Sequence, residues 1–354
     1  RVDTLEARTS ELEANQFSTT TKLVGSVVFG QQGSISSSDL LGSGSENVTF
    51  SHRTRLLFIT SFTGQDKLIT RLEAGNVVSP FSNVTNLAGL SYASNTGNTF
   101  NLTLLSYEFP LTDKIRVVVG QDVIMEDTHP LHSPLAGLGT GAITTFADRT
   151  PLLRQPSYGG LGLKWDLAKD WMVGLMYSAG SSPDPGAGKG LFDGSYSASA
   201  SVNYLGPKFT AGLFYAHAYY SNPDNQGVTL LGGVGTQSLT NTFLRPVGGT
   251  TVTGDSVTTD SFGFQASAQF TPHFGAHGWF GYVDAQATHD NRDAELYTWA
   301  LGVTFPDLFK QGSMGAITFG KPLSVSSTFG GKKDDKTPYL LEVMYKYSLN
   351  DNIF

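Results

Sequence analysis

Cysteine is absent from the 354 residues of this chain, which excludes disulfide bonds, cysteine-ligated metals and a cysteine nucleophile. Charged residues are also scarce, at 15% of the sequence against roughly 25% in ordinary soluble proteins. No run of 18 or more apolar residues occurs, so a membrane-spanning helix is excluded. The net charge of −7 argues against general binding to nucleic acid.

What the sequence has instead is strict alternation of polar and apolar residues. From Gly194 to Tyr204, serine or asparagine occupies every odd position, and tyrosine, alanine or valine occupies the even positions from Tyr196 onward. In an extended strand this pattern puts the hydroxyl groups on one face and the apolar groups on the other. Tyr196 and Tyr204 mark the ends of the apolar face, and aromatic rings prefer the two interfaces of a bilayer. A tilted strand of about 9–11 residues crosses a membrane, so this stretch predicts a membrane-spanning strand.

The same design recurs along the chain. Fourteen strands are predicted, over residues 22–30, 54–63, 67–73, 99–109, 114–122, 158–166, 171–179, 194–204, 209–219, 260–270, 274–285, 294–305, 313–321 and 338–348. The connections between them alternate between short and long without exception. Tight turns at one end and large loops at the other are typical of outer-membrane barrels. The sequence therefore predicts an all-β fold, a transmembrane antiparallel β-barrel over residues 17–354.

Both ends of the chain depart from this pattern. Val2, Leu5, Thr9 and Leu12 fall on heptad a and d positions, which predicts the end of a periplasmic coiled coil over 1–16; a short amphipathic helix is the alternative. No signal peptide precedes it, so we expect a mature or trimmed chain. After residue 351 a fifteenth strand begins. Bacterial barrels have even strand counts and no open edge, so we expect sixteen strands with the closing ones missing here. A fourteen-stranded barrel with a short tail is the alternative.

The run from Val2 to Leu23, VDTLEARTSELEANQFSTTTKL, resembles the junction between coiled coil and barrel in cyanobacterial outer-membrane porins with an N-terminal S-layer-homology domain. Those porins are related to carbohydrate-selective porins. Residues 188–196, GKGLFDGSY, and 345–353, YKYSLNDNI, are similar to the same family. The resemblance implies a homotrimer of sixteen-stranded barrels with a periplasmic N-terminus, and some members are described as porins for inorganic ions and iron. The domain that grips peptidoglycan in that family is absent from this chain, so peptidoglycan is an implied partner of the parent protein.

Charged residues on the polar face of the strands are candidates for the channel lining. A charge at mid-bilayer on the lipid face costs about 2–4 kcal/mol, whereas water in the lumen solvates it. Rings of charged side chains set ion selectivity in pores. The alternative is that these residues only solvate the wall, or pair with Glu73 and Glu342. The candidates are Arg53, Arg55, Arg71, Arg116 and Lys164.

The long connection over 123–157 is the candidate constriction. It combines an apolar stretch at 134–139 with charged residues, which predicts a loop folded into the lumen with its charges toward the channel. A metal site made by Asp127, His129 and His132 is an alternative, although their spacing is not specific for a metal. The charged candidates in this loop are Glu126, Asp127, Asp148, Arg149 and Arg154.

The candidate enzyme motifs in the sequence do not match the patterns that their chemistry requires. Residues 186–190, GAGKG, lack the spacing and the Ser or Thr of a phosphate-binding loop, and Ser256 lies in a long loop with no evident paired histidine. No cofactor is expected. The sequence predicts a porin that passes small hydrophilic solutes, mainly inorganic ions and by resemblance iron, in contact with outer-membrane lipid. A structural anchor between membrane and peptidoglycan with an incidental pore, and a hydrolase using Ser256, are the alternatives.

Overall fold

The computed structural model describes residues 20–35, 47–80, 87, 89–121, 125–137, 140–222, 228–236, 239, 244–247, 250–289, 291–329, 333–350 and 352–353. The coiled coil predicted over 1–16 lies outside these residues.

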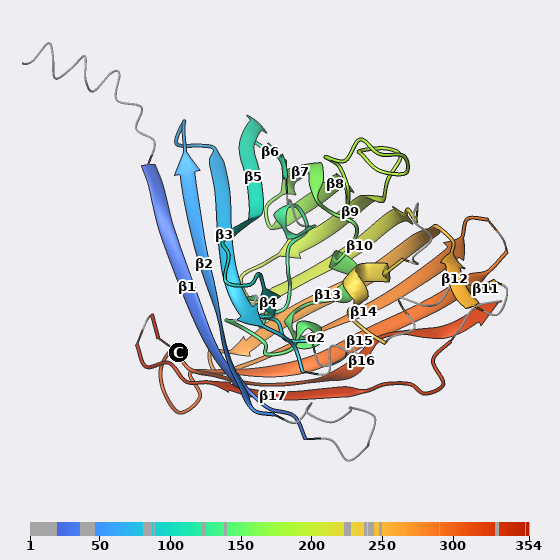
Figure 1. The fold of residues 1–354 in the computed structure, drawn as a ribbon. Coiled ribbons are helices and arrows are strands. Elements are labelled where there is room, and N and C mark those ends of the chain that lie inside the picture. Colours follow the sequence, from blue (N-terminus) through green and yellow to red (C-terminus); the bar gives the residue numbers. More distant parts are fainter. Residues whose placement is uncertain are drawn as a thin grey trace, which may run out of the picture.

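One antiparallel ladder accounts for most of the described chain, and Figure 1 shows it curling around an interior. Its fourteen successive strands confirm the fourteen predicted ones. The strands are β1 (Thr20–Gln32), β2 (Thr49–Ser61), β3 (Lys67–Val77), β5 (Asn101–Thr112), β6 (Ile115–Gln121), β7 (Gly159–Ala168), β8 (Trp171–Ala179), β9 (Tyr196–Leu205), β10 (Phe209–Tyr220), β13 (Val257–Thr271), β14 (Phe274–Ala287), β15 (Asp293–Pro306), β16 (Met314–Phe329) and β17 (Leu340–Lys346). Among the described residues, each of these strands is hydrogen-bonded to the next, and β1 and β17 are the two ends of the sheet.

The two ends of the barrel differ as the connection lengths predict. Tight turns link β2 to β3, β5 to β6 and the later hairpins at one end, and long connections lie at the other. The long connections contain short elements that periodicity did not predict, because their residues show no helical or strand repeat. These elements are β4 (Ser94–Asn95), η2 (Met125–Asp127), α2 (Thr145–Asp148), η3 (Pro151–Leu153), η4 (Leu230–Gly233), β11 (Leu244–Val247) and β12 (Thr250–Gly254).

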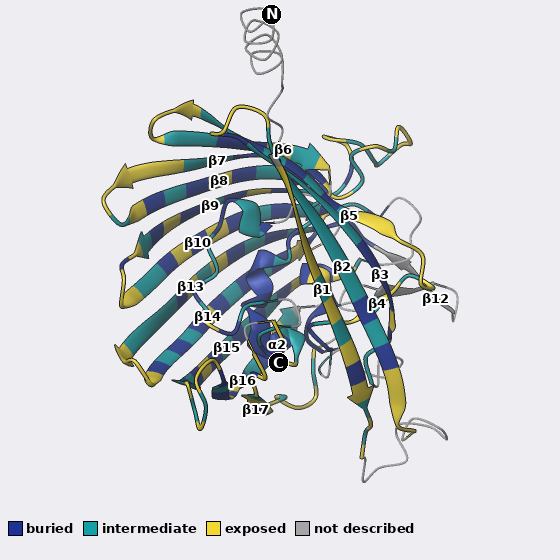
Figure 2. Ribbon diagram, turned by 90° about the vertical axis from the view of Figure 1, so that its left-hand side faces the viewer, coloured by how far each residue is buried: buried dark blue, intermediate teal, exposed yellow. Residues whose placement is uncertain are grey.

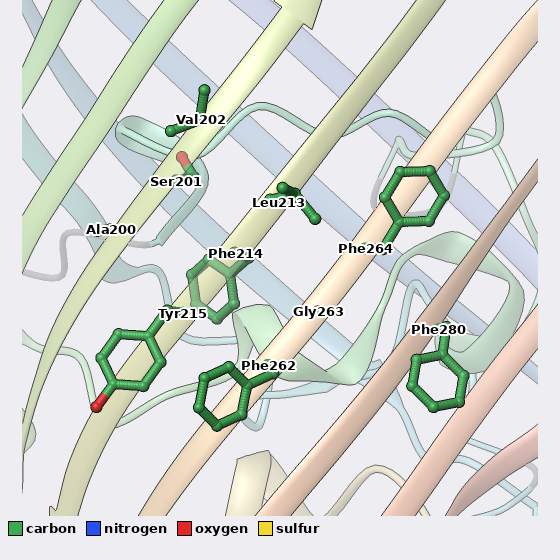
Figure 3. A pocket seen from close by; sticks show the side chains of 10 residues that line it. All are labelled: Ala200, Ser201, Val202, Leu213, Phe214, Tyr215, Phe262, Gly263, Phe264 and Phe280. Carbon is green, nitrogen blue, oxygen red and sulfur yellow. The ribbon is translucent and has the colours of Figure 1, made fainter.

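The polar and apolar faces of the strands are oriented as predicted. On β9, Ser197, Ser199, Ser201 and Asn203 are all buried, whereas the exposed fraction of Val202 is 44%. Figure 3 shows the same division across β10, β13 and β14, where outward rings stand on the face opposite Phe214 and Ser201. The exposed outward side chains there are Leu213, Tyr215, Phe262, Phe264 and Phe280. Large apolar groups therefore cover the outside of this barrel. No helix among the described residues is long and apolar enough to cross a membrane.

Candidate functional site

The connection between β6 and β7 lies inside the barrel. Figure 2 shows α2 within the ring of strands. Phe146 of α2 packs edge-on against Trp279 of β14, with ring centroids 5.6 Å apart, and both side chains are buried. Leu135, from the stretch predicted to pack on the wall, is fully buried with Ala316 of β16 and Met344 of β17. This connection, called the inner loop below (residues 125–137 and 140–157), therefore crosses the interior against the inner face of the sheet.

Two histidines fasten the inner loop to the serine-rich face of β9. His129 shares hydrogen bonds with Ser201 Oγ through Nδ1 (2.7 Å) and with Ser199 Oγ through Nε2 (2.8 Å). His132 Nε2 lies 3.0 Å from Asn203 Oδ1. Both ring nitrogens of His129 are thus engaged by the wall, which leaves none to ligate a metal. Among the described residues there is no group of three or more His, Cys, Asp or Glu side chains able to hold a metal ion.

A buried carboxylate on β17 fastens the other side of the inner loop. Glu342 is 6% exposed, and it accepts hydrogen bonds from the backbone N–H groups of Ile143 (3.1 Å) and Thr144 (2.7 Å). The Thr144 hydroxyl donates to the same carboxylate at 2.6 Å. From the sequence, Glu342 was considered as a partner for the wall cations. It binds the backbone of the inner loop instead.

Part of the connection between β3 and β5 joins the inner loop at this point. Leu90 and Thr144 form an isolated antiparallel bridge, and Ser91 N–H donates to the Ile143 carbonyl at 2.8 Å. Arg53 Nη1 of β2 donates to the Ser91 carbonyl at 3.4 Å. These contacts form an inner strap, residues 89–91 with 142–145, that connects β2 with β17 through the interior.

Inward-facing glycines provide the space for the inner loop. A Cβ atom placed on Gly174 of β8 would lie 2.2 Å from the Thr128 carbonyl oxygen, and one placed on Gly281 of β14 would lie 2.4 Å from Leu152. Gly263 of β13 lies directly opposite Gly281 and also faces Leu152. The loop can approach the wall this closely only because these positions carry no side chain.

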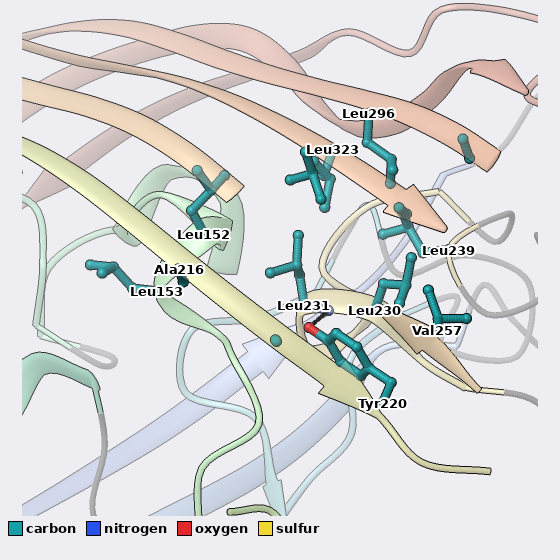
Figure 4. Close-up of a cluster of buried hydrophobic side chains, with 14 of the residues drawn as sticks. Leu152, Leu153, Ala216, Tyr220, Leu230, Leu231, Leu239, Val257, Leu296 and Leu323 are labelled. Carbon is teal, nitrogen blue, oxygen red and sulfur yellow. Dashed lines mark hydrogen bonds between the residues drawn. The ribbon is translucent and has the colours of Figure 1, made fainter. Parts of the chain in front are cut away.

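One side of the interior is filled by apolar packing. Leu152 and Leu153 of η3 pack with Leu230 and Leu231 of η4 against inward side chains of β10–β16 (Figure 4). The Tyr220 hydroxyl accepts a hydrogen bond from Leu231 N–H at 3.2 Å. This bond fixes the connection between β10 and β13, which contains η4, to β10. Two connections therefore meet on this wall and form one hydrophobic cluster with it.

The opposite side of the interior carries the charges, and the five predicted wall cations fall into two groups. In the first, Arg55 forms an ion pair with Glu73, and Arg53 is 2% exposed beside them. Arg71 donates to the hydroxyl and the carbonyl of Thr103 at 2.9 and 2.8 Å. Glu73 was one of the two partners considered from the sequence, and for Arg55 that pairing is correct.

The second group lies near the tight turns. Glu108 of β5 pairs with Arg116 at 2.5 Å, with Lys164 at 2.7 Å and with Lys67 at 3.4 Å. One buried carboxylate thus gathers three cations from neighbouring strands, a contact set that the sequence did not predict.

The loop charges predicted to face the channel are mostly paired. Arg149 forms an ion pair with Glu126, and its Nε lies 3.7 Å from Asp148 Oδ2. Asp148 is fully buried and accepts a hydrogen bond from Gly137 N–H at 3.0 Å. Arg154 lies against Gly232 of η4.

Across the interior, the loop acids act on the wall arginines. Glu126 and Asp127 stabilise the charge of Arg71 electrostatically, and Asp148 does the same for Arg53. Glu126, Asp127 and Asp148 of the inner loop therefore lie within electrostatic range of the arginines of β2 and β3.

Comparison with known proteins is consistent with this arrangement. The family model for carbohydrate-selective porins of the OprB family matches residues 1–354. The chain belongs to the OprB family. The family and the fold point to a channel rather than an enzyme, located in the outer membrane.

Relatives and solved structures extend the comparison of this OprB-family chain. An uncharacterized protein of Synechocystis sp. is 31% identical over the whole chain and 67% of its own length. One of Nostoc sp. is 31% identical over the whole chain and 63% of its own length, so the chain spans about two thirds of these relatives. OmpT of Vibrio cholerae, in trimer form, has a TM-score of 0.54 at 10% identity, covering 93% of this chain and 85% of that one. OprB of Pseudomonas putida has a TM-score of 0.50 at 14% identity, covering 91% and 78%. At these identities, the two structures show a shared fold.

Sequence reasoning missed three features of this OprB-family site. Glu342 was considered only as a partner for wall cations, and His129 and His132 only as metal ligands. The glycines under the loop were not singled out at all. Alternation did place Ser199, Ser201 and Asn203 on the inner face, and that polar face was the signal that a polar loop segment would bind there.

Gly174→Ala is expected to loosen the inner loop. The added methyl meets the Thr128 backbone, and overpacking of this kind costs about 1–3 kcal/mol. We expect trypsin to cleave after Arg149 and Arg154 at least fivefold faster than in the wild type. Gly25→Ala, whose nearest neighbour would lie at an ordinary 3.7 Å, serves as the control. Equal cleavage of all three proteins would contradict the close loop contact.

Acid is expected to weaken the docking of the inner loop. Burial lowers the pKa of His129 from 6.5 to about 3, and its neighbours Ser199, Ser201 and Phe214 carry no charge. Above pH 6.5 the ring is neutral whether docked or free. Between pH 6.5 and 3 the free loop binds the proton, so the docking constant falls by up to tenfold per pH unit.

The rates of trypsin cleavage of the protein at pH 7 and at pH 5, each divided by the rate for an unfolded substrate at the same pH, measure this effect. Burial also lowers the pKa of His132, against the opposing effect of its hydrogen bond to Asn203 Oδ1, so His132 contributes with the same sign. The pH dependence is expected to shrink in His129→Gln and to vanish in the double variant with His132→Gln. An undiminished dependence in the double variant would assign the effect to other groups.

Proposed function

We propose that this chain forms a channel for passive diffusion of small hydrophilic solutes, mainly inorganic ions and iron among them, through a water-filled lumen narrowed by the inner loop. The observation that carries the proposal is the charged interior: Arg53, Arg55 and Arg71 lie on the wall, and the charges of Glu126 and Asp127 on the loop act on Arg71. Charged rings of this kind select ions by their field.

The position of the hydrophobic cluster supports one course for the solute path. Leu152, Leu231 and their neighbours fill the side of the interior along β10–β16, so the proposed path runs on the side of β2, β3, β5, β6 and β7. Arg53, Arg55, Arg71, Arg116 and Lys164 lie along that side. We infer that the five wall residues and the loop residues Glu126, Asp127, Asp148, Arg149 and Arg154 set the charge of the path, some directly and some by holding the others.

Carbohydrates are the second candidate solutes, because the matching family model is that of carbohydrate-selective porins. Guanidinium and carboxylate groups also hydrogen-bond to sugar hydroxyls, so one charged path suits either solute. Single-channel recordings of the purified protein in planar bilayers, in KCl and then with added glucose, discriminate between the two. Conductance that glucose blocks half-maximally at millimolar concentration favours sugars, and unblocked conductance favours ions. A folded barrel with no conducting steps would end the channel proposal.

Assembly follows the same proposal. OmpT of Vibrio cholerae is described in trimer form, and a homotrimer is proposed here. β1 begins at the end of the tight turns, since Thr20 pairs with Ser61, so the N-terminus is proposed to be periplasmic. Sixteen strands in all, and a periplasmic coiled coil over 1–16 before the barrel, belong to the same proposal.

A structural anchor is the competing function. A coiled coil that leads to a peptidoglycan-binding domain in the parent protein would tie the outer membrane to the wall. A deletion strain that loses membrane attachment but keeps solute uptake would favour the anchor. Loss of uptake with intact attachment would favour the channel.

A further inference from the structure

Three polar side chains, those of His277, Trp279 and Thr318, are enclosed between the inner loop and the wall, apart from the charged path. His277 of β14, Gly302 of β15 and Thr318 of β16 lie side by side in the strand register and face inward. Trp279 follows His277 two residues later on the same face. The exposed fractions are 4% for His277, 4% for Trp279 and 1% for Thr318.

Apolar contacts of the inner loop close this place on two sides. Phe146 packs with Trp279 and Ala300 on one side, and Leu135 packs with Ala316 and Met344 on the other. Ala316 lies two residues before Thr318 on the same strand face. The polar row therefore lies beneath the inner loop, between the contacts that Phe146 and Leu135 make with the wall.

The polar atoms in this row have no protein partner among the described residues. They are both ring nitrogens of His277, the indole Nε1 of Trp279 and the hydroxyl of Thr318. The ring centroids of His277 and Trp279 are 6.5 Å apart. Buried polar groups in folded proteins are nearly always hydrogen-bonded, so these four atoms are candidates to bind a small polar ligand.

Gly302 shows how near two of these groups are to each other. A Cβ atom at Gly302 would lie 2.6 Å from His277 Nε2 and 2.9 Å from Thr318 Oγ1. The nearest atom to that Cβ position is His277 Cε1 at 2.3 Å, so the imidazole packs directly on Gly302. Nε2 and Oγ1 are therefore close enough for one oxygen atom, displaced from the Cβ position toward the lumen, to bridge them by hydrogen bonds. A methyl group at residue 302 would push the imidazole of His277 out of this position.

The chemistry of the three groups defines the ligand. The indole N–H only donates, while the neutral imidazole and the hydroxyl each donate and accept. An anion cannot donate to the imidazole, and an ammonium ion cannot accept from the indole. We propose that a hydroxyl-bearing molecule, either ordered water or the hydroxyl of a small polyol, is bound by His277, Trp279 and Thr318 beneath the inner loop. This site is independent of the proposed conduction path.

Crystals of the purified protein grown without polyol, at a resolution that shows ordered water, test the proposal. We expect a density peak within hydrogen-bond distance of both His277 Nε2 and Thr318 Oγ1. The same peak after soaking in glucose identifies water, and its growth into a ring identifies a polyol; either supports the site. A direct hydrogen bond between His277 and Thr318, with no density between them, would overturn it.

Substitution provides a second readout in solution. In a variant whose only tryptophan is Trp279, with Trp165, Trp171 and Trp299 changed to phenylalanine, loss of the hydroxylic ligand is expected to shift the emission to shorter wavelength. Gly302→Ala and Thr318→Val should each cause this shift. Thr298→Val is the matched control, because the Thr298 hydroxyl already donates to the Lys321 carbonyl at 3.0 Å. Emission that is equal in all four proteins would reject the site, whether or not they conduct.

Discussion

Replacing Glu342 with alanine is expected to enlarge the conductance steps of the channel and make them noisier. The carboxylate accepts three hydrogen bonds from Ile143 and Thr144, and all three lose their acceptor in the variant. A hydrogen bond to a charged group contributes about 1.5–3 kcal/mol. A loss of about 3 kcal/mol, which one such bond can supply, already weakens loop docking by on the order of 100-fold. The freed loop then leaves the lumen for part of the time.

Single-channel recordings at pH 7 measure the change. Glu342→Gln keeps an oxygen acceptor but loses the charge, so its conductance is expected between those of the wild type and the alanine variant. Glu295→Ala is the control, because Glu295 sits on the outer face beside Ser327 and Tyr282. Steps of wild-type size and noise in Glu342→Ala would show that the strap is held by other contacts, with His129 as the first candidate.

The faces of the strands were predictable because strand geometry is local. Side chains alternate with period 2 whatever the rest of the chain does, so Ser199 and Val202 could be assigned to opposite faces from the sequence. The same parity put Arg53, Arg71 and Lys164 on the inner face. The alternation of turn and loop lengths then fixed which strands are neighbours, and the ladder followed.

The contacts inside the barrel were not predictable in the same way. Thr144 and Glu342 are separated by 198 residues, and His129 and Ser201 by 72. Such pairs depend on the register of many strands and on the path of a loop with no repeat. The four residues of α2 are likewise too few for a hydrophobic period, and packing of Phe146 on Trp279 positions them. The inward position of the loop followed from its composition, but its anchors did not.

Exchanging Arg71 for glutamate is expected to move the ion preference of the channel toward cations. Arg71 lies on the inner face of β3 and looks toward Glu126 and Asp127, so the change removes one positive charge from the proposed path and adds a negative one. A unit charge 4 Å from an ion in water contributes about 1 kcal/mol. The two-unit change therefore shifts the cation-to-anion permeability ratio by roughly tenfold or more. Reversal potentials in a KCl gradient measure it.

A control variant shows whether the ion preference depends on the position of the exchanged charge or only on the net charge of the protein. Lys169→Glu makes the same change in the exposed turn between β7 and β8, and its reversal potential is expected to match the wild type. Arg71→Gln changes one unit and is expected to give about half the shift. The effect should also shrink from 0.1 M to 1 M salt, because the screening length falls from about 10 Å to about 3 Å. If both Arg71 variants keep the wild-type reversal potential, ions do not pass along β3, and the path must lie elsewhere in the barrel.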